Sequence, residues 1–558
     1  MQEAVREQHR HLRRDGPLGT SRLPPRRLDG DHHVAERGAR EPAALAFSHG
    51  EGQHVGRPVP PPKVAVERAD DGVVAEENGQ LRVVEPERRE HSLGATSHVG
   101  GSNRPRSEAA GPEQHGHATH DSKPRYGRPR MFDTILITGD EEVAARVERT
   151  CKRLGVDLAD AGDVEGTRGW RPDVDAVVGA AERTGAKAVH PGYVAPLRRT
   201  ALARALRERG IGFVGPSTVA LEAMQDKLAM RAAAERVGVR VVPGGAEPLR
   251  DLAHARSVAG DLGFPLVIKP IAGTAALGVE VAHDEEGVEI AVGRARERAS
   301  DTFGDARVLA EKMVETPREI EVTVVVGPNG TSTTLVERET SIQRGYDKLI
   351  AESPSPLLGQ RADGESLREA LADAALRIAT EIQLEGLATF EFLLDAECRV
   401  YFLEANADMH GAILATEMAT GIDPIELQMQ LASGEPLEDE ARLTASGHAF
   451  EVRVIADRRG EKVRSFRFPP SPHGKVRFEP AVEPLVPMQT ELEPLVARIA
   501  TFAPIRHQAL LALDRALAET SVAPIGTNLT FLRRVLNHDS FRAGQYDVGF
   551  TERLFERT

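Results

Sequence analysis

From Thr134 onward, short apolar stretches alternate with amphipathic segments, and this alternation limits the possible folds more than any other feature of the chain. Residues 134–138 have the pattern of a buried strand, and 141–154 place Val143, Val147, Cys151 and Leu154 on one helical face. Further segments follow as helices at 174–184 and 201–209, and as strands at 186–190 and 211–215. This order predicts an α/β fold with a mostly parallel sheet.

The second half of the chain continues with strands and ends with helices. We expect strands at 266–269, 308–313 and 319–326, a hairpin-like pair at 389–394 and 399–403, and further strands from 449. Helices are expected at 508–517 and 527–536. Cys151 fits a core position better than that of a nucleophile, because it lies on the apolar face of its helix.

Residues 1–130 lack the side chains needed for a core. They hold most of the histidines but only two aromatic residues, Phe47 and Tyr126, and no periodic pattern. Such a segment cannot offset its ordering entropy by burying apolar surface. Two interpretations remain: a disordered tail, or a start codon assigned too far upstream, with Met131 as the true start. We favour the second.

Composition excludes several classes of protein. The net charge of -14 argues against a nucleic-acid-binding surface over the whole chain, and two cysteines cannot build a disulfide scaffold or a Cys-based zinc site. No apolar run is long enough to span a membrane, and no secretory signal pattern opens the chain. We therefore expect a cytoplasmic protein.

Glu391, Glu404 and Asn406 form the clearest candidate for a chemical site. If their two strands pair antiparallel, two carboxylates and one amide oxygen converge on one face of a sheet. Mg²⁺ prefers such oxygen ligands and completes its shell with water and phosphate oxygens. The alternative is two solvent-facing strand glutamates, which is the common situation for charged strand residues.

Three lysines lie beside apolar strands or helix starts: Lys227, Lys269 and Lys348. Their charges suit phosphate oxygens, although a single lysine is more often a solvated surface residue. Lys269 is the most suggestive, because Gly273 and Gly278 bracket a loop just after it. That loop, IAGTAALG, matches neither a P-loop nor a dinucleotide fingerprint. His190 and His410 lack partners at metal-ligand spacing, so core or loop roles are favoured.

The order of motifs from about Phe132 to Leu554 resembles the biotin carboxylase branch of the ATP-grasp enzymes. The matching segments include AVHPGY at 188–193, MQDKLAMRAAAERVGV at 224–239, VIKP at 267–270, AEKMVETPREIEV at 310–322, LVERETSIQRGYDKLIAESP at 335–354, ATFEFLL at 388–394, YFLEAN at 401–406 and TEMATGIDPIELQ at 416–428.

The resemblance implies three domains after the first 130 residues: an N-terminal α/β domain at 131–243, an ATP-grasp domain with a lid at 244–440, and a C-terminal α/β domain at 441–558. It also implies activation of bicarbonate by ATP to carboxyphosphate, followed by carboxylation of biotin on a carrier protein. Mg²⁺, or Mn²⁺ in its place, would bridge the phosphates. A homodimer and separate carrier and carboxyltransferase subunits are the implied partners.

Residue by residue, the resemblance assigns Glu391, Glu404 and Asn406 to the metal and Lys348 to bicarbonate. The expected ATP-binding residues are Lys227, Lys269, Gly273, Gly278, Glu311, Lys312 and Gln343. Of these, Lys227 and Lys269 should contact the phosphates, whereas Glu311 and Lys312 should lie at the adenine edge.

The chain departs from the family pattern where bicarbonate and biotin should react. The family arginine that holds bicarbonate falls on Asp408, and the general-base glutamate falls on Ala412, with His410 as a conceivable substitute base. Two family histidines are replaced by Glu319 and Tyr346. The lid loop has fewer glycines, and we identify no counterpart of a biotin-steadying arginine, since Arg477 comes too early.

Two hypotheses follow from this mixture. The first is an ATP-dependent ligase of the biotin carboxylase type, which forms an acyl phosphate from bicarbonate or another carboxylate. The second is a catalytically inactive paralogue that acts as a structural or regulatory partner. Fold alone does not decide between them.

Overall fold

The computed structural model describes two hairpin strands and most of the chain from Phe132 to Phe555. The described residues are 73–77, 80–84, 132–139, 141–162, 164–274, 276–407, 412–437, 443–458, 461–468, 475–482 and 494–555. The chain divides into two units, Met1–His115 and Gly116–Thr558. In the first unit, β1 (Val73–Glu77) pairs antiparallel with β2 (Gln80–Val84). The two interpretations of residues 1–130, a disordered tail or a misplaced start codon, otherwise fall on residues that the structure does not describe.

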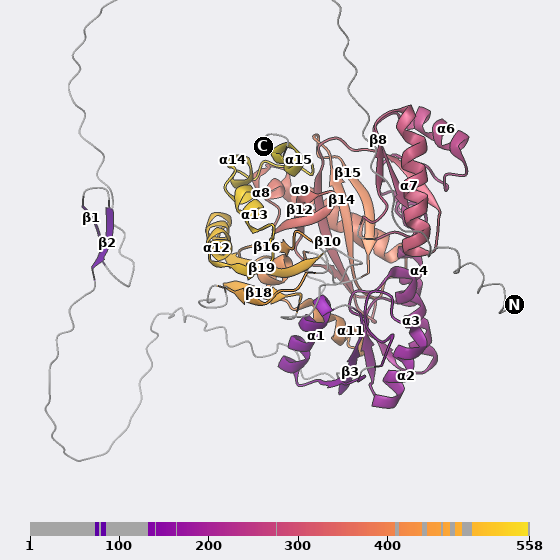
Figure 1. Ribbon diagram of the computed structural model, residues 1–558, viewed down its shortest axis with the longest axis horizontal. Coiled ribbons are helices and arrows are strands. Elements are labelled where there is room, and N and C mark those ends of the chain that lie inside the picture. The colour runs from indigo at the N-terminus through magenta and orange to yellow at the C-terminus, as the bar shows by residue number, and fades with distance from the viewer. Residues whose placement is uncertain are drawn as a thin grey trace, which may run out of the picture. The chain divides into compact units, whose positions relative to one another are not determined.

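The second unit begins with a four-stranded parallel sheet, as the alternation predicted, and Figure 1 labels its strand β3. The strand order is β4-β3-β5-β6. Its strands are β3 (Thr134–Ile137), β4 (Asp157–Ala159), β5 (Ala188–His190) and β6 (Gly212–Phe213). The accompanying helices are α1 (Glu141–Leu154), α2 (Val174–Thr184), α3 (Pro196–Glu208), α4 (Thr218–Met224) and α5 (Lys227–Arg236). Helix α3 begins earlier than expected, because Pro196 opens it at a position that proline favours.

A small antiparallel sheet, β8-β7-β9, follows and packs with two helices around its own apolar cluster. Its elements are α6 (Leu252–Leu262), β7 (Leu266–Pro270), β8 (Glu280–Ala282), α7 (Glu285–Phe303) and β9 (Val308–Lys312). Lys269 lies on β7, and Gly273 and Gly278 lie in the loop between β7 and β8.

The largest sheet is antiparallel, and among the sheets of the described residues only the one formed by β3, β4, β5 and β6 is parallel. Its strand path is β15-β14-β10-β12-β13-β16-β19-β18, with β11 paired to β10. The strands are β10 (Arg318–Val326), β11 (Ser332–Thr334), β12 (Arg338–Arg344), β13 (Asp347–Ser353), β14 (Gly386–Leu394), β15 (Val400–Asn406), β16 (His448–Ile455), β18 (Val476–Pro480) and β19 (Leu495–Ala503). Short connections such as the Gly345–Tyr346 turn explain the antiparallel order, since parallel strands need longer crossovers.

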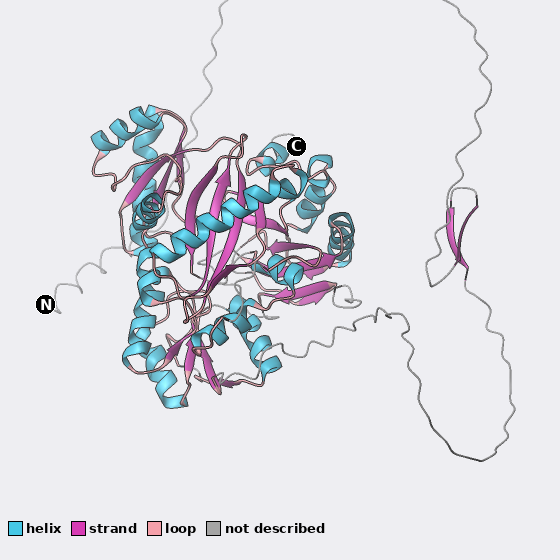
Figure 2. Ribbon diagram, turned by 180° about the vertical axis from the view of Figure 1, so that it is seen from behind, coloured by secondary structure: helices cyan, strands magenta, loops and turns pink. Residues whose placement is uncertain are grey.

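One face of this sheet is covered by a long helix, α9 (Gly364–Glu381), which runs across the sheet in Figure 2. Ile320 and Val322 of β10, and Phe390 and Phe392 of β14, pack in the same apolar cluster as α9. Strand residues alternate between faces, so Glu319, Glu321 and Glu391 must lie on the opposite face. The period-2 pattern therefore separates a hydrophobic core from a polar face.

The chain ends in helices around a second large core. The remaining elements are α8 (Pro356–Gln360), α10 (Ile413–Thr420), α11 (Pro424–Ala432), β17 (Ser465–Arg467), α12 (Arg506–Glu519), β20 (Ser521–Ala523), α13 (Leu529–Leu536), α14 (Asp539–Arg542) and α15 (Phe550–Phe555). None of the described helices meets the length and hydropathy that crossing a lipid bilayer requires.

Glu352 ties the central sheet to these last helices. Its buried carboxylate accepts two hydrogen bonds from Arg506 at 2.6 and 2.8 Å, one from the Tyr546 hydroxyl at 2.6 Å, and contacts His448 Nε2 at 2.7 Å. Burial alone would raise the pKa of this carboxyl, but the hydrogen bonds from His448 and Arg506 lower it to about 2. Glu352 lies four residues beyond Lys348 on β13, so this anchor also fixes a strand of the polar face.

We predict that Glu352→Gln destabilises the protein by about 3 kcal/mol at neutral pH, the free energy that the depressed pKa represents. A carboxyl whose pKa is lowered by folding contributes its full stabilisation at pH values above the pKa it has in the unfolded chain, about 4.3. The difference from wild type should therefore shrink as the pH falls from there toward 2. Thermal unfolding followed by circular dichroism at several pH values measures it. Glu397→Gln, at an exposed site, is the control; an equal loss in both variants would contradict the role of Glu352.

Candidate active site

The polar face of the central sheet gathers the predicted metal ligands. Antiparallel pairing of β14 with β15 is confirmed, and it sets Glu391 opposite Glu404. The Asn406 side-chain amide donates to Glu391 Oε1 at 2.7 Å and to Glu404 Oε1 at 3.3 Å. The three side chains therefore lie together, as the strand pattern indicated.

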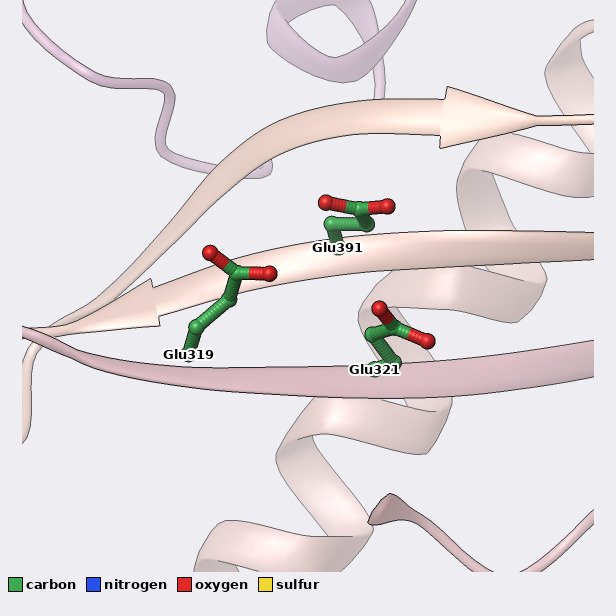
Figure 3. A group of neighbouring side chains, drawn as sticks. All are labelled: Glu319, Glu321 and Glu391. Carbon is green, nitrogen blue, oxygen red and sulfur yellow. The ribbon is translucent and has the colours of Figure 1, made fainter. Parts of the chain in front are cut away.

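Two further glutamates enlarge this acidic face. Glu319 and Glu321 project from β10 beside Glu391 of β14, and all three carboxylates rise from the same side of the sheet (Figure 3). Glu321 is paired directly with Glu391 in the strand register, and one oxygen from each carboxylate lies within 4.8 Å of the others. Like charges facing each other on adjacent strands destabilise a sheet unless cations balance them.

Lys348 supplies that balance from β13. Its Nζ lies 3.0 Å from Glu319 and 2.8 Å from Glu391, and it donates a hydrogen bond to Glu321. Burial would lower the pKa of Lys348, but the three carboxylates raise it well above its ordinary value. Arg338 adds a second positive charge 2.5 Å from Glu321.

The two predicted metal carboxylates have opposite pKa shifts. Burial raises the pKa of Glu391 to about 8; Lys348 opposes this rise, whereas the nearby glutamates reinforce it. Burial would also raise the pKa of Glu404, but Lys227 and Lys269 lower it to about 2. Glu404 is therefore ionised at neutral pH. At Glu391, the positive charge of Lys348 does not offset the effect of burial on the pKa.

This donor set fits a hard divalent cation. Glu391 and Glu404 offer carboxylate oxygens, and half a turn of the Asn406 amide would add its Oδ1. Burial and the neighbouring glutamates raise the pKa of Glu391 in spite of Lys348, and a divalent ion beside it would favour its ionised form. The residues present therefore match Mg²⁺ or Mn²⁺.

The predicted phosphate-binding lysines approach the same face from two other parts of the fold. Lys227, at the start of α5, donates to Glu404 Oε2 at 2.6 Å and to the Gly273 carbonyl at 2.8 Å. Lys269 of β7 lies 2.5 Å from Glu311 Oε2, and Arg231 donates to the other oxygen of Glu311 at 2.8 Å. Glu311 thus links α5 to the small sheet and fixes Lys269, a contact that the sequence did not reveal.

The other predicted nucleotide residues surround this group. Lys312 donates to the Phe264 carbonyl, which keeps its side chain at the edge of the small sheet. Gly278 has φ +84, and a Cβ there would lie 2.9 Å from Pro270 Cγ, so a larger residue could not adopt this loop without strain. Gln343 is buried and donates to Glu319 Oε2 at 2.7 Å. Contact of these residues with nucleotide remains a prediction.

The departures from the family pattern are only partly described. Asp408, His410 and Ala275 lie outside the described residues. Ala412 is buried and packs with Ala351 and Ala415. Tyr346 occupies the turn before Lys348 with φ +71, a backbone conformation rare for residues other than glycine.

His190, Cys151 and Arg477 have structural partners. His190 is buried, accepts a hydrogen bond from the Gly192 amide and faces Gln428, so its core role is confirmed. Burial raises the pKa of the Cys151 thiol to about 11, which agrees with a core residue. Arg477 lies on β18 and pairs with Glu417 and Glu479.

Sequence reasoning missed the roles of Glu321, Arg338 and Arg231. The segment EIEV placed Glu319 and Glu321 two residues apart, a spacing that puts them on one strand face beside Glu391. Arg338 and Arg231 gave no comparable signal, because their partners are distant in the sequence.

Comparison with known families divides the chain into three consecutive matches. Residues 168–221 match the biotin carboxylase N-terminal domain, 226–440 the ATP-binding domain of the carbamoyl-phosphate synthase large chain, and 441–553 the biotin carboxylase C-terminal domain. These matches support the α/β, ATP-grasp architecture.

Two curated relatives show how far the likeness extends. Biotin carboxylase of Halalkalibacterium halodurans is 34% identical over 447 residues, covering 75% of this chain and 97% of that protein. The propionyl-CoA carboxylase alpha chain of Ruegeria pomeroyi is 31% identical over 468 residues, covering 75% of this chain and 68% of the relative.

Solved structures give the same result. The biotin carboxylase domain dimer of Hydrogenobacter thermophilus 2-oxoglutarate carboxylase, in complex with MgADP, ADP and bicarbonate, has a TM-score of 0.70 and 27% identity over 76% of this chain and 98% of that chain. Biotin carboxylase of Campylobacter jejuni, in a complex named for β,γ-ATP, has a TM-score of 0.68 and 28% identity, covering 76% and 99%.

We predict that Lys269→Gln weakens Mg-ATP binding at least tenfold, because a charge-assisted contact to phosphate is lost while Glu311 keeps Arg231 as its partner. Calorimetric titration with Mg-ATP measures the dissociation constant. Lys187→Gln removes an exposed lysine of the first domain and should bind Mg-ATP like the wild type. Equal affinity of the Lys269→Gln variant and the wild type would show that Lys269 does not contact the phosphates.

Proposed function

This chain belongs to the biotin carboxylase family of ATP-grasp enzymes, and on that premise we propose that it is a ligase that phosphorylates a carboxylate acceptor with ATP. In the conventional reaction the acceptor is bicarbonate, and the activated carboxyl group passes to biotin on a separate carrier. The observation that supports this most is the convergence of Glu391, Glu404 and Asn406 with Lys227 on one face of the sheet.

ATP would enter with its phosphates against Lys227 and Lys269. Both ammonium groups contact carboxylates in this structure, Glu404 and Glu311, so phosphate oxygens would find cations already in place. Glu311 positions Lys269, because its second oxygen is held by Arg231. Fixed charges of this kind stabilise the transferring phosphoryl group without reorganisation.

Glu391, Glu404 and Asn406 would hold Mg²⁺, which when bound neutralises charge on the phosphates and holds them in place. Glu404 is ionised throughout the physiological range, and Lys348 favours the ionised form of Glu391 against the burial that raises its pKa. Asn406 contacts both carboxylates, so it orients the pair.

In the first step, an acceptor oxygen forms a bond to the γ-phosphorus while the bond from that phosphorus to the β–γ bridging oxygen breaks. ADP leaves, and the acceptor becomes an acyl phosphate. Lys348 would hold the acceptor close to the phosphate. In the conventional second step, N1 of biotin gives its proton to a general base and forms a bond to the carboxyl carbon, while the bond from that carbon to the phosphate oxygen breaks and inorganic phosphate leaves.

The second step is where this chain differs most. Ala412 has no group that accepts a proton, and its side chain is buried among Ala351 and Ala415. Loss of a general base costs about 100- to 10,000-fold in rate. This supports two further outcomes: a different acceptor, or a non-catalytic partner of an active carboxylase.

The partners follow from the same premise. Two relatives are named as alpha chains or subunits of acyl-CoA carboxylases, and a structural neighbour is described as a domain dimer. We infer that this chain forms a homodimer and works with separate biotin carrier and carboxyltransferase subunits.

We predict that the full chain releases ADP from Mg-ATP and that Glu404→Ala abolishes the release, because a metal ligand and the partner of Lys227 are lost. A coupled ADP assay with and without bicarbonate and free biotin measures it. Release that needs both establishes conventional carboxylation. Release without that need, still lost in Glu404→Ala, indicates another acceptor. No release, with no ATP-induced rise in melting temperature, overturns the ligase and leaves the non-catalytic partner.

A further inference from the structure

The ammonium of Lys348 has no donor left for another anion. A lysine ammonium carries three N–H donors. One oxygen each of Glu319, Glu321 and Glu391 lies within 3.0 Å of Lys348 Nζ. The proposed function assigns Lys348 to the acceptor, but all three of its N–H donors already have a carboxylate as partner.

The three carboxylates differ in what else balances their charge. Glu321 also pairs with Arg338 at 2.5 Å, and Glu391 belongs to the predicted metal ligands. For Glu319, Lys348 is the one cationic group at ion-pair distance among the described residues. A metal at Glu391 would compete with Lys348 for this carboxylate and so weaken one of its three contacts, whereas the contact with Glu319 would remain.

Glu319 is also held where it is. Its Oε2 accepts from Gln343 at 2.7 Å and its Oε1 from the Thr340 hydroxyl at 3.1 Å, while its backbone amide donates to the Ser341 hydroxyl at 2.9 Å. The side chain is buried on the face shown in Figure 3. Moving it away would break these bonds inside the protein, so its negative charge is a fixed part of the acceptor site.

We propose that Glu319 is a specificity-determining residue, an internal anion that competes with the acceptor for Lys348. This rests on the proposed function, in which Lys348 holds the acceptor. With Glu319 present, a compact anion such as bicarbonate can reach at most one N–H donor of Lys348, and the Glu319 carboxylate on the same ammonium repels it. Without Glu319, two donors are open and the opposing charge is gone.

The test compares bicarbonate affinity in the wild type, Glu319→Gln and Glu319→His, since both substitutions remove the charge and keep a polar side chain. Calorimetric titration of bicarbonate, with Mg²⁺ and a non-hydrolysable ATP analogue and again without nucleotide, needs no turnover. We expect the dissociation constant to fall at least tenfold in both variants, because a unit charge is removed next to the bound anion. Glu397→Gln, which removes an exposed carboxylate, should match the wild type.

Steady-state kinetics give the second readout. In an active enzyme, KM for bicarbonate should fall with the dissociation constant, while KM for Mg-ATP stays within about twofold. A purely structural role for Glu319 would instead alter kcat and both KM values together. Unchanged bicarbonate affinity in whichever of the two variants folds would overturn the proposal.

The failure of the proposed function has a different signature. If neither the wild type nor the variants release ADP or bind Mg-ATP, the ligase is lost. The nucleotide-free bicarbonate titration still decides the role of Glu319, because it depends only on the competition at Lys348.

Discussion

Charge balance on the polar face of the central sheet is the constraint on which the rest of this structure depends. Glu321 and Glu391 face each other on neighbouring strands, an arrangement that repulsion would destabilise. Lys348 and Arg338 make it tolerable by contributing positive charge from β13 and β12. The cations are thus part of the fold as well as of the site, and their removal would leave buried carboxylates without partners.

The architecture brings the remaining charges to this face from separate places. Helix α9 covers the apolar side of the sheet, so the polar side is left for ligands. Lys227 comes from α5 and Lys269 from the small sheet, and Glu311 joins these two elements through Arg231. A nucleotide between them would replace contacts that the protein now makes with its own acids. The ion pairs therefore hold both lysines in position on this face of the sheet.

The sequence predicted those parts of the site that depend on local pattern. Alternation in TFEFLL and YFLEAN located Glu391, Glu404 and Asn406 on one face, and the hairpin register confirmed it. The local pattern could not predict the ion pair between Glu311 and Lys269, because these residues lie on different strands, β9 and β7. The antiparallel central sheet was also less visible, because β12 and β13 carry many polar residues on a buried surface.

The proposed phosphate-binding and acceptor-binding regions differ in how many of the family's residues they keep. On the phosphate side, Glu404 forms an ion pair with Lys227 at 2.6 Å, and Lys227 and Lys269 lower the pKa of this carboxyl against its burial. On the acceptor side, Lys348 is engaged by three carboxylates, and Ala412 offers no base. Glu319 accepts hydrogen bonds from Gln343 and Thr340, so the acid beside Lys348 is held in place by neighbouring side chains of the same sheet, and the charge around this lysine is set by the fold.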